Sequence, residues 1–279
     1  MTARDGARDH EEHVGRLFAG LAGSLDGDPD QRAPLVLLHG LTFDRTMWRP
    51  ALAELRKIDP RRRIFAVDLP GHGGSPARSC YDLGNIAEGV HRAAVSARLR
   101  GPVVVGHSVG AVIATAYAAS YPACGVVNVD HWLQTEPFAR LAQSRAGQIR
   151  GPGFPAVWEM FEASIHIGLL PAPAQELLRS ARYVRQDLIT GYWRELLDRP
   201  VAELAEKATA WRAALRAAQV PYLFIAGHEV EPGYRDWLNH VLPQASVAVW
   251  PGSGHFPHLA HPRRFAECLA ATAAWGGVR

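Results

Sequence analysis

Residues 103–119 begin with Val103-Val104-Val105-Gly106-His107-Ser108-Val109-Gly110 and continue in a helix-forming run of small apolar residues. Glycines two positions on either side of Ser108 allow the sharp turn from strand to helix that lifts a serine hydroxyl clear of a sheet. The first amides of the following helix point at the same place, so the Val109 N–H is available to a developing oxyanion. We therefore predict that Ser108 is a nucleophile.

Strand-like apolar runs alternate with helical stretches along most of the chain. This alternation is typical of an α/β protein with a mostly parallel sheet covered by helices on both faces. We predict strands at 35–38, 64–67, 103–105, 126–129, 222–226 and 247–250. We predict helices at 48–57, 86–99, 109–120, 234–241 and 265–275.

The alternation stops between about 134 and 219, where short amphipathic segments such as 157–169 and 174–197 follow one another. We predict an α/β core domain at 1–133 and 216–279 and a helical insertion at 134–215. The aromatic side chains of the helical insertion either pack it onto the core or line a pocket. They are Phe154, Trp158, Phe161, Tyr183, Tyr192 and Trp193.

Composition excludes several classes of protein. Of 279 residues, 48% are hydrophobic and 20% charged, which excludes a disordered chain. No apolar run approaches the roughly 18 residues of a membrane helix. The net charge is only +3 and the basic residues are dispersed apart from Arg61-Arg62-Arg63, so no nucleic-acid partner is expected.

The cysteines and the N-terminal stretch indicate the cellular compartment of the protein. Cys80, Cys124 and Cys268 are odd in number and far apart, which fits reduced thiols better than a disulfide framework. The first 18 residues contain acidic side chains and no apolar segment, unlike a secretory or transit peptide. We therefore expect a cytoplasmic protein.

A second loop supplies a candidate partner for the oxyanion. His39-Gly40-Leu41-Thr42 follows the predicted strand 35–38, and the Leu41 N–H is the candidate donor. We expect His39 to hold this loop by hydrogen bonding, beside the substrate pocket.

Four motifs together resemble the α/β-hydrolase superfamily. They are His39-Gly40, DLPGHGGS at 68–75, GHSVG at 106–110 and GSGHFPHLAHP at 252–262. The resemblance covers residues 34–133 and 216–279, and it implies an α/β-hydrolase fold in which the helical insertion corresponds to the family's variable cap. It also implies a catalytic order of serine, acid and histidine, with His255 as the base that takes the Ser108 proton.

The acid has more than one candidate. Many relatives carry an Asp three residues after the glycine that follows the strand at 222–226, but Val230 occupies that position here. Asp130, at the end of the preceding predicted strand, is the preferred acid, and Glu229 and Glu231 are the alternatives. His255, His258 and His261 are spaced like metal ligands on a helix, but Pro257 and Pro262 interrupt such a helix, so we expect no metal.

A narrower resemblance concerns GVVNVDHWL at 125–133 and LFIAGHEVEPGYRDWL at 223–238. With the GSGHFP segment they are similar to cofactor-free dioxygenases of 3-hydroxy-4-oxoquinolines, in which a His–Asp pair deprotonates the ring hydroxyl before O₂ attacks. Those enzymes commonly have a histidine after the elbow serine, where this chain has Val109.

Our preferred hypothesis is a serine hydrolase that needs no cofactor and cleaves an ester-type bond of a small apolar or aromatic substrate. Ser108, His255 and Asp130 form its triad, and Leu41 and Val109 bind the oxyanion. We place His39, Trp132, Trp158 and Phe161 at the substrate pocket. The cofactor-free dioxygenase is the alternative, and a ligand receptor without turnover is a third hypothesis.

Overall fold

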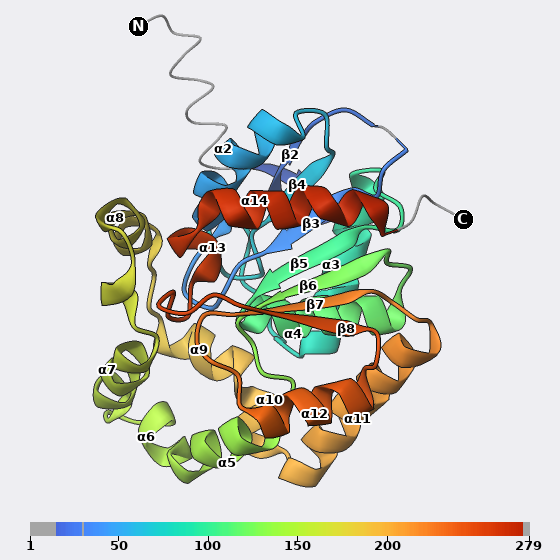
Figure 1. Cartoon of the computed structure of the whole chain (residues 1–279). Coiled ribbons are helices and arrows are strands. Elements are labelled where there is room, and N and C mark those ends of the chain that lie inside the picture. The colour runs from blue at the N-terminus through green and yellow to red at the C-terminus, as the bar shows by residue number, and fades with distance from the viewer. Residues whose placement is uncertain (1–14, 30, 276–279) are drawn as a thin grey trace, which may run out of the picture.

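The computed structural model describes residues 15–29 and 31–275, which form one eight-stranded sheet flanked by helices (Figure 1). The strand order is β1-β2-β4-β3-β5-β6-β7-β8, with β1 and β2 antiparallel and the strands from β4 onward parallel. The strands are β1 (Arg16–Phe18), β2 (Leu21–Asp26), β3 (Leu35–Leu38), β4 (Ile64–Val67), β5 (Val103–His107), β6 (Gly125–Val129), β7 (Tyr222–Ala226) and β8 (Ala245–Val249). This confirms the predicted mostly parallel α/β-hydrolase fold.

Helices cover both faces of the sheet. On one face α14 (Pro262–Ala271) packs on α2 (Arg49–Ile58), with α13 (Pro257–Ala260) beside them. On the other face α3 (Leu83–Ser96) and α11 (Val201–Ala217) both pack on α4 (Val109–Ser120), and α12 (Pro232–Val241) packs on α11. A hydrophobic core lies on each face of the sheet. Side chains along a strand point to opposite faces, so Val36 and Leu38 of β3 belong to one core and Leu35 and Leu37 to the other.

The two antiparallel strands β1 and β2 were not predicted from the sequence. β1 has only three residues, and β2 contains Gly23 and Ser24, which interrupt an apolar run. Gly23 is required by packing, since a Cβ there would lie 2.4 Å from the ring of Phe65 on β4. The formation of β2 at this edge of the sheet therefore depends on packing against β4 and not on a local sequence pattern.

Between β6 and β7 the described chain contains helices and no strand. They are α5 (Glu136–Ser144), α6 (Ala146–Arg150), α7 (Phe154–Ser164), η2 (Ile167–Leu169), α8 (Ala172–Ala181), α9 (Gln186–Tyr192), α10 (Arg194–Asp198) and α11. α11 packs on α4, which itself covers the sheet. The division into a core and a helical insertion ending at residue 215 stays a prediction.

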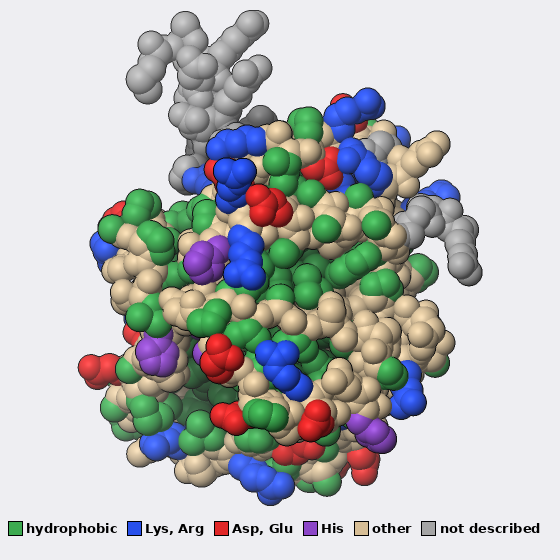
Figure 2. Space-filling view, viewed as in Figure 1, with side chains coloured by type: hydrophobic (Ala, Val, Ile, Leu, Met, Phe, Trp, Pro, Cys, Tyr) green, Lys and Arg blue, Asp and Glu red, His purple; other side chains and the backbone are tan. Residues whose placement is uncertain are grey.

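The surface and the helices agree with the charge and hydropathy patterns. On the face seen in Figure 2, Lys and Arg side chains alternate with acidic ones and form no continuous basic area. None of the helices within residues 15–29 and 31–275 is long and apolar enough to cross a membrane. Residues 1–14, on which the expectation of no leader peptide largely rests, lie outside the described residues.

Candidate active site

Ser108 lies on a strained turn between β5 and α4. Its backbone angles are φ 54° and ψ −122°, a conformation that costs a non-glycine residue about 1–3 kcal/mol. A Cβ on Gly106 would lie 2.1 Å from the Gly110 carbonyl oxygen, and one on Gly110 would lie 2.4 Å from the Leu38 carbonyl oxygen. The two glycines therefore make the turn sterically possible, as the sequence predicted.

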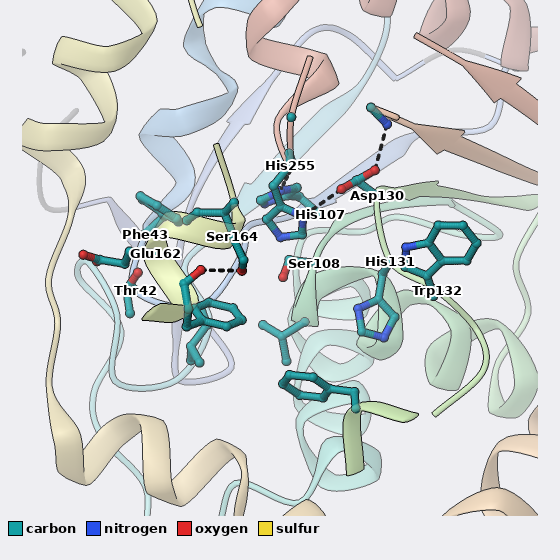
Figure 3. A pocket seen from close by; sticks show the side chains of 18 of the residues that line it. Thr42, Phe43, His107, Ser108, Asp130, His131, Trp132, Glu162, Ser164 and His255 are labelled. Carbon is teal, nitrogen blue, oxygen red and sulfur yellow. Dashed lines mark hydrogen bonds and ion pairs between the residues drawn. The ribbon is translucent and has the colours of Figure 1, made fainter. Parts of the chain in front are cut away.

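His255 and Asp130 form a hydrogen-bonded pair at the carboxyl end of the sheet. His255 Nδ1 lies 2.8 Å from Asp130 Oδ2, and the other carboxylate oxygen accepts the Gly227 N–H at 2.8 Å (Figure 3). Burial by itself raises the pKa of the Asp130 carboxyl, but the hydrogen bonds from His255 and Gly227 outweigh burial and lower that pKa. The carboxylate is therefore ionised at neutral pH.

The two glutamates that the sequence left as alternatives do not approach His255. Glu229 and Glu231 are exposed, and neither hydrogen-bonds to His255 in the described structure. Of the candidate acids, Asp130 is the one in contact with the imidazole.

The serine and the histidine border the same cavity. Figure 3 shows Ser108 next to the His255 ring, and both residues line the cavity. Within the described residues Ser108 Oγ makes no hydrogen bond to His255. In many free enzymes the hydrogen bond between nucleophile and base is long or poorly aligned and tightens only when substrate binds.

His107, next to Ser108, supports the loop that carries His255. Its Nε2 lies 2.8 Å from the His255 carbonyl oxygen and donates to it. Burial, and then the positive charge that His255 can carry, hold the pKa of His107 well below its ordinary value, so the ring is neutral. The sequence analysis noted His107 only as part of the motif.

His39 supports the candidate oxyanion loop and does not line the cavity. The Leu69 N–H donates to its Nε2 at 2.8 Å, and its Nδ1 lies 2.8 Å from the Gly40 carbonyl oxygen. The predicted loop-holding contacts are present, but the placement of His39 at the pocket is corrected, because both ring nitrogens are used and the residue is fully buried.

Leu41 and Val109 both border the cavity at the level of Ser108. In the part of the chain that the structure describes, neither backbone N–H donates to a protein acceptor. The Leu41 and Val109 N–H groups are therefore both available to donate to an oxygen atom bound next to Ser108.

The cavity has a volume of about 660 Å³ and is lined mainly by apolar side chains. Trp132, Trp158 and Phe161 line it as expected, and Tyr192 and Trp193 join them. Phe154 packs behind Trp158, and Tyr183 is 59% exposed. The aromatic residues of the helical insertion therefore divide between packing and lining.

Polar side chains that the sequence analysis did not single out also reach the cavity. His131 follows Asp130, while Glu162 and Arg182 form an ion pair, and Glu162 also accepts the Trp158 indole N–H at 2.6 Å. The sequence signal that could have indicated His131 is its position two residues after β6. Among the described residues no group of three or more His, Cys, Asp or Glu could hold a metal ion, and His258 lies buried among aromatic rings.

The model of the alpha/beta hydrolase family matches residues 35–268. This chain belongs to the alpha/beta hydrolase family. The relatives found for this hydrolase include the pimeloyl-[acyl-carrier protein] methyl ester esterase of Yersinia pseudotuberculosis, 26% identical over 261 residues that cover 88% of this chain and 93% of the relative. The family match and this relative make the chain a hydrolase enzyme.

Two solved structures illustrate how widely this alpha/beta hydrolase fold is shared. A thermophilic esterase from Thermogutta terrifontis has a TM-score of 0.64 at 21% identity and covers 90% of this chain and 92% of its own. An AqdC variant in complex with its substrate, the Pseudomonas quinolone signal, has a TM-score of 0.74 at 17% identity and covers 92% of this chain and 96% of its own. At these identities the similarity shows the fold alone.

Proposed function

We propose that this hydrolase is a serine esterase that cleaves an ester-type bond of a small apolar or aromatic substrate through Ser108, His255 and Asp130. The observation that carries the proposal is the 2.8 Å contact between His255 Nδ1 and Asp130, with Ser108 on a strained turn in the same cavity. The relative named as a methyl ester esterase supports ester chemistry.

The first half of the reaction follows from these positions. Ser108 Oγ attacks the ester carbonyl carbon while its proton passes to His255 Nε2, and the carbonyl π electrons move onto oxygen. The N–H groups of Leu41 and Val109 bind that oxyanion, and each such donor contributes about 10²-fold or more to kcat. Asp130 accepts the His255 Nδ1–H and stabilises the imidazolium.

The intermediate then collapses. The carbon–oxygen bond to the alcohol breaks, and the leaving oxygen takes the proton from His255. Water attacks the acyl group on Ser108 by the same steps, with His255 first taking a proton from water and then returning it to Ser108 Oγ. The apolar cavity excludes other water and accepts the acyl or alcohol portion.

A fluorophosphonate probe followed by intact-mass measurement tests this proposal. We expect one adduct on the wild type, none on Ser108→Ala, and an adduct on Ser164→Ala. Ser164 is a matched control, because it lines the same cavity but donates to the Phe161 carbonyl oxygen at 2.6 Å. The absence of an adduct on the wild type, or an adduct that persists in Ser108→Ala, contradicts the proposal.

One observation favours a second function. Asp130, at the end of β6, pairs with His255, as in the cofactor-free dioxygenases that the sequence resembles locally. In that reaction His255 deprotonates a ring hydroxyl and O₂ attacks the resulting anion. Oxygen consumption on addition of a 3-hydroxy-4-oxoquinoline, retained in Ser108→Ala, supports this function, whereas the esterase proposal predicts none.

A further inference from the structure

The turn that follows β6 is held by a buried asparagine. Asn128 is fully buried in β6, and its Oδ1 accepts the His131 N–H at 3.0 Å while its Nδ2 donates to the His131 carbonyl oxygen at 2.7 Å. Asp130, which lies between Asn128 and His131 in the sequence, has a φ of 54°, and the chain bends at this point. A single side chain thus fixes both backbone polar groups of His131.

The asparagine is itself fixed by a chain of hydrogen bonds through the core. Asn128 Nδ2 also donates to the Tyr222 hydroxyl at 3.0 Å, and that hydroxyl lies 3.0 Å from Thr115 Oγ1. Thr115 Oγ1 donates to the Ala111 carbonyl oxygen at 2.8 Å, so the Tyr222 hydroxyl donates to Thr115. A buried network in which every donor is used specifies one arrangement. This network therefore sets the direction in which the chain leaves β6.

The result is an imidazole aimed into the cavity. His131 lines the cavity, and Figure 3 shows its ring on the cavity side of β6 near Trp132. The ring makes no hydrogen bond to any residue that the structure describes. Burial, and then the positive charge that His255 can carry, lower the pKa of His131 to about 4, although Asp130 opposes this. The ring is neutral at pH 7 and has one free donor and one free acceptor.

We propose that His131 binds a neutral oxygen-bearing group of the substrate, a ketone carbonyl or a hydroxyl, at a point away from the scissile ester; this rests on the proposed esterase function. An ionised group is disfavoured there, because a neutral imidazole offers no opposite charge, the cavity is lined mainly by apolar side chains, and the Arg182 guanidinium in that lining is paired with Glu162. The substrate class is therefore an apolar or aromatic ester with a second, uncharged oxygen function.

A binding measurement tests this without turnover. The probes are 4-phenyl-2-butanone and its matched hydrocarbon butylbenzene, and the signal is the change in tryptophan fluorescence on binding, since Trp132, Trp158 and Trp193 line the cavity. We expect the wild type to prefer the ketone, His131→Leu to lose that preference by about tenfold to a hundredfold, and His131→Gln to retain part of it. Equal affinity of the wild type for both probes, or an unchanged preference in His131→Leu, overturns the proposal.

Ester turnover separates this proposal from the esterase function. The ratio of kcat/KM for p-nitrophenyl esters of 4-oxo- and 5-oxohexanoate to that for p-nitrophenyl hexanoate cancels general effects of a substitution. We expect at least one oxo ester to be preferred by the wild type and the ratio to fall about tenfold or more in His131→Leu. If the ketone preference is lost in His131→Leu but no ester is hydrolysed, the esterase function fails and the binding role of His131 stands.

The variant Tyr222→Phe tests the supporting network from outside the cavity. It removes the hydroxyl that accepts from Asn128, and Tyr222 does not line the cavity. We expect a smaller loss of ketone preference than in His131→Leu, with binding of butylbenzene retained. If Tyr222→Phe weakens both probes equally, the network serves stability alone and does not orient His131.

Discussion

The backbone N–H of His255 donates a hydrogen bond to the carbonyl oxygen of Ile165, 3.2 Å away. Ile165 directly follows α7 in the helical insertion. A second hydrogen bond, 2.8 Å long, runs from the Tyr183 N–H to the Thr42 carbonyl oxygen beside Leu41. The helical insertion is thus hydrogen-bonded both to the loop of the proposed base and to the proposed oxyanion loop. We therefore expect a displacement of the insertion to shift both loops.

A pair of glycine substitutions tests this coupling. A Cβ on Gly254 would lie 3.1 Å from the Ile165 carbonyl oxygen, whereas one on Gly252 would meet nothing within 4 Å, and both glycines have positive φ. We expect both Gly254→Ala and Gly252→Ala to lower Tm, because alanine is strained at positive φ. We expect only Gly254→Ala to reduce kcat, by about tenfold to a hundredfold, since small misplacements of a base are costly. Equal losses of kcat in the two variants contradict the coupling.

The acid is tested by Asp130→Asn. Because the Gly227 N–H requires the amide oxygen as its acceptor, the amide NH₂ faces His255 and donates to Nδ1, which favours the wrong imidazole tautomer. We therefore expect kcat on a p-nitrophenyl ester to fall about 10²- to 10⁴-fold. Glu229→Gln and Glu231→Gln are controls, because both side chains are exposed and away from His255. A larger loss in either glutamate variant than in Asp130→Asn would show that the acid is misassigned.

Two neighbouring residues of α7 test whether the aromatic lining of the cavity contacts the substrate. Phe161 lines the cavity, whereas Met160 is 43% exposed and does not. We expect Phe161→Ala to raise KM for p-nitrophenyl naphthoate about tenfold and to affect p-nitrophenyl acetate much less, because only the larger ester buries its ring against Phe161. Met160→Ala should change neither KM. A parallel rise for both esters in Phe161→Ala would mean that the residue only supports the helical insertion.

Buried histidines make stability depend on pH. Burial lowers the pKa of His258 from its ordinary value of 6.5 to about 3, and both ring nitrogens lack a hydrogen-bond partner among the described residues. Below pH 6.5 the unfolded chain binds a proton that the folded chain does not, so the free energy of unfolding falls with pH by up to about 1.4 kcal/mol per unit until about pH 3.

We expect His258→Phe to reduce the slope of the unfolding free energy against pH between pH 5.5 and 4.5. The reduction should be about 1.4 kcal/mol per pH unit, the contribution of one proton, as measured by guanidinium denaturation. The slope should not vanish, because burial also lowers the pKa of His39 to about 4 and of His72 to about 3. An unchanged slope in His258→Phe would show that His258 is already protonated or unburied in solution.

The sequence by itself determined the parallel strands, the turn at Ser108 and the position of His255 after the last strand. These features depend on neighbouring residues: apolar runs form buried strands, and the steric need for Gly106 and Gly110 belongs to a turn of a few residues. The short edge strands β1 and β2 carry no such local pattern, since Gly23 is required only by the ring of Phe65.

Only the tertiary structure decided which polar groups meet. Asp130, and neither Glu229 nor Glu231, contacts His255, His131 enters the cavity, and His39 stays outside it. The direction of each of these side chains depends on contacts far along the chain, such as Gly227 on Asp130 and Leu69 on His39. Hydrogen bonds between segments brought together by the sheet fix these directions, and no pattern within one segment encodes them.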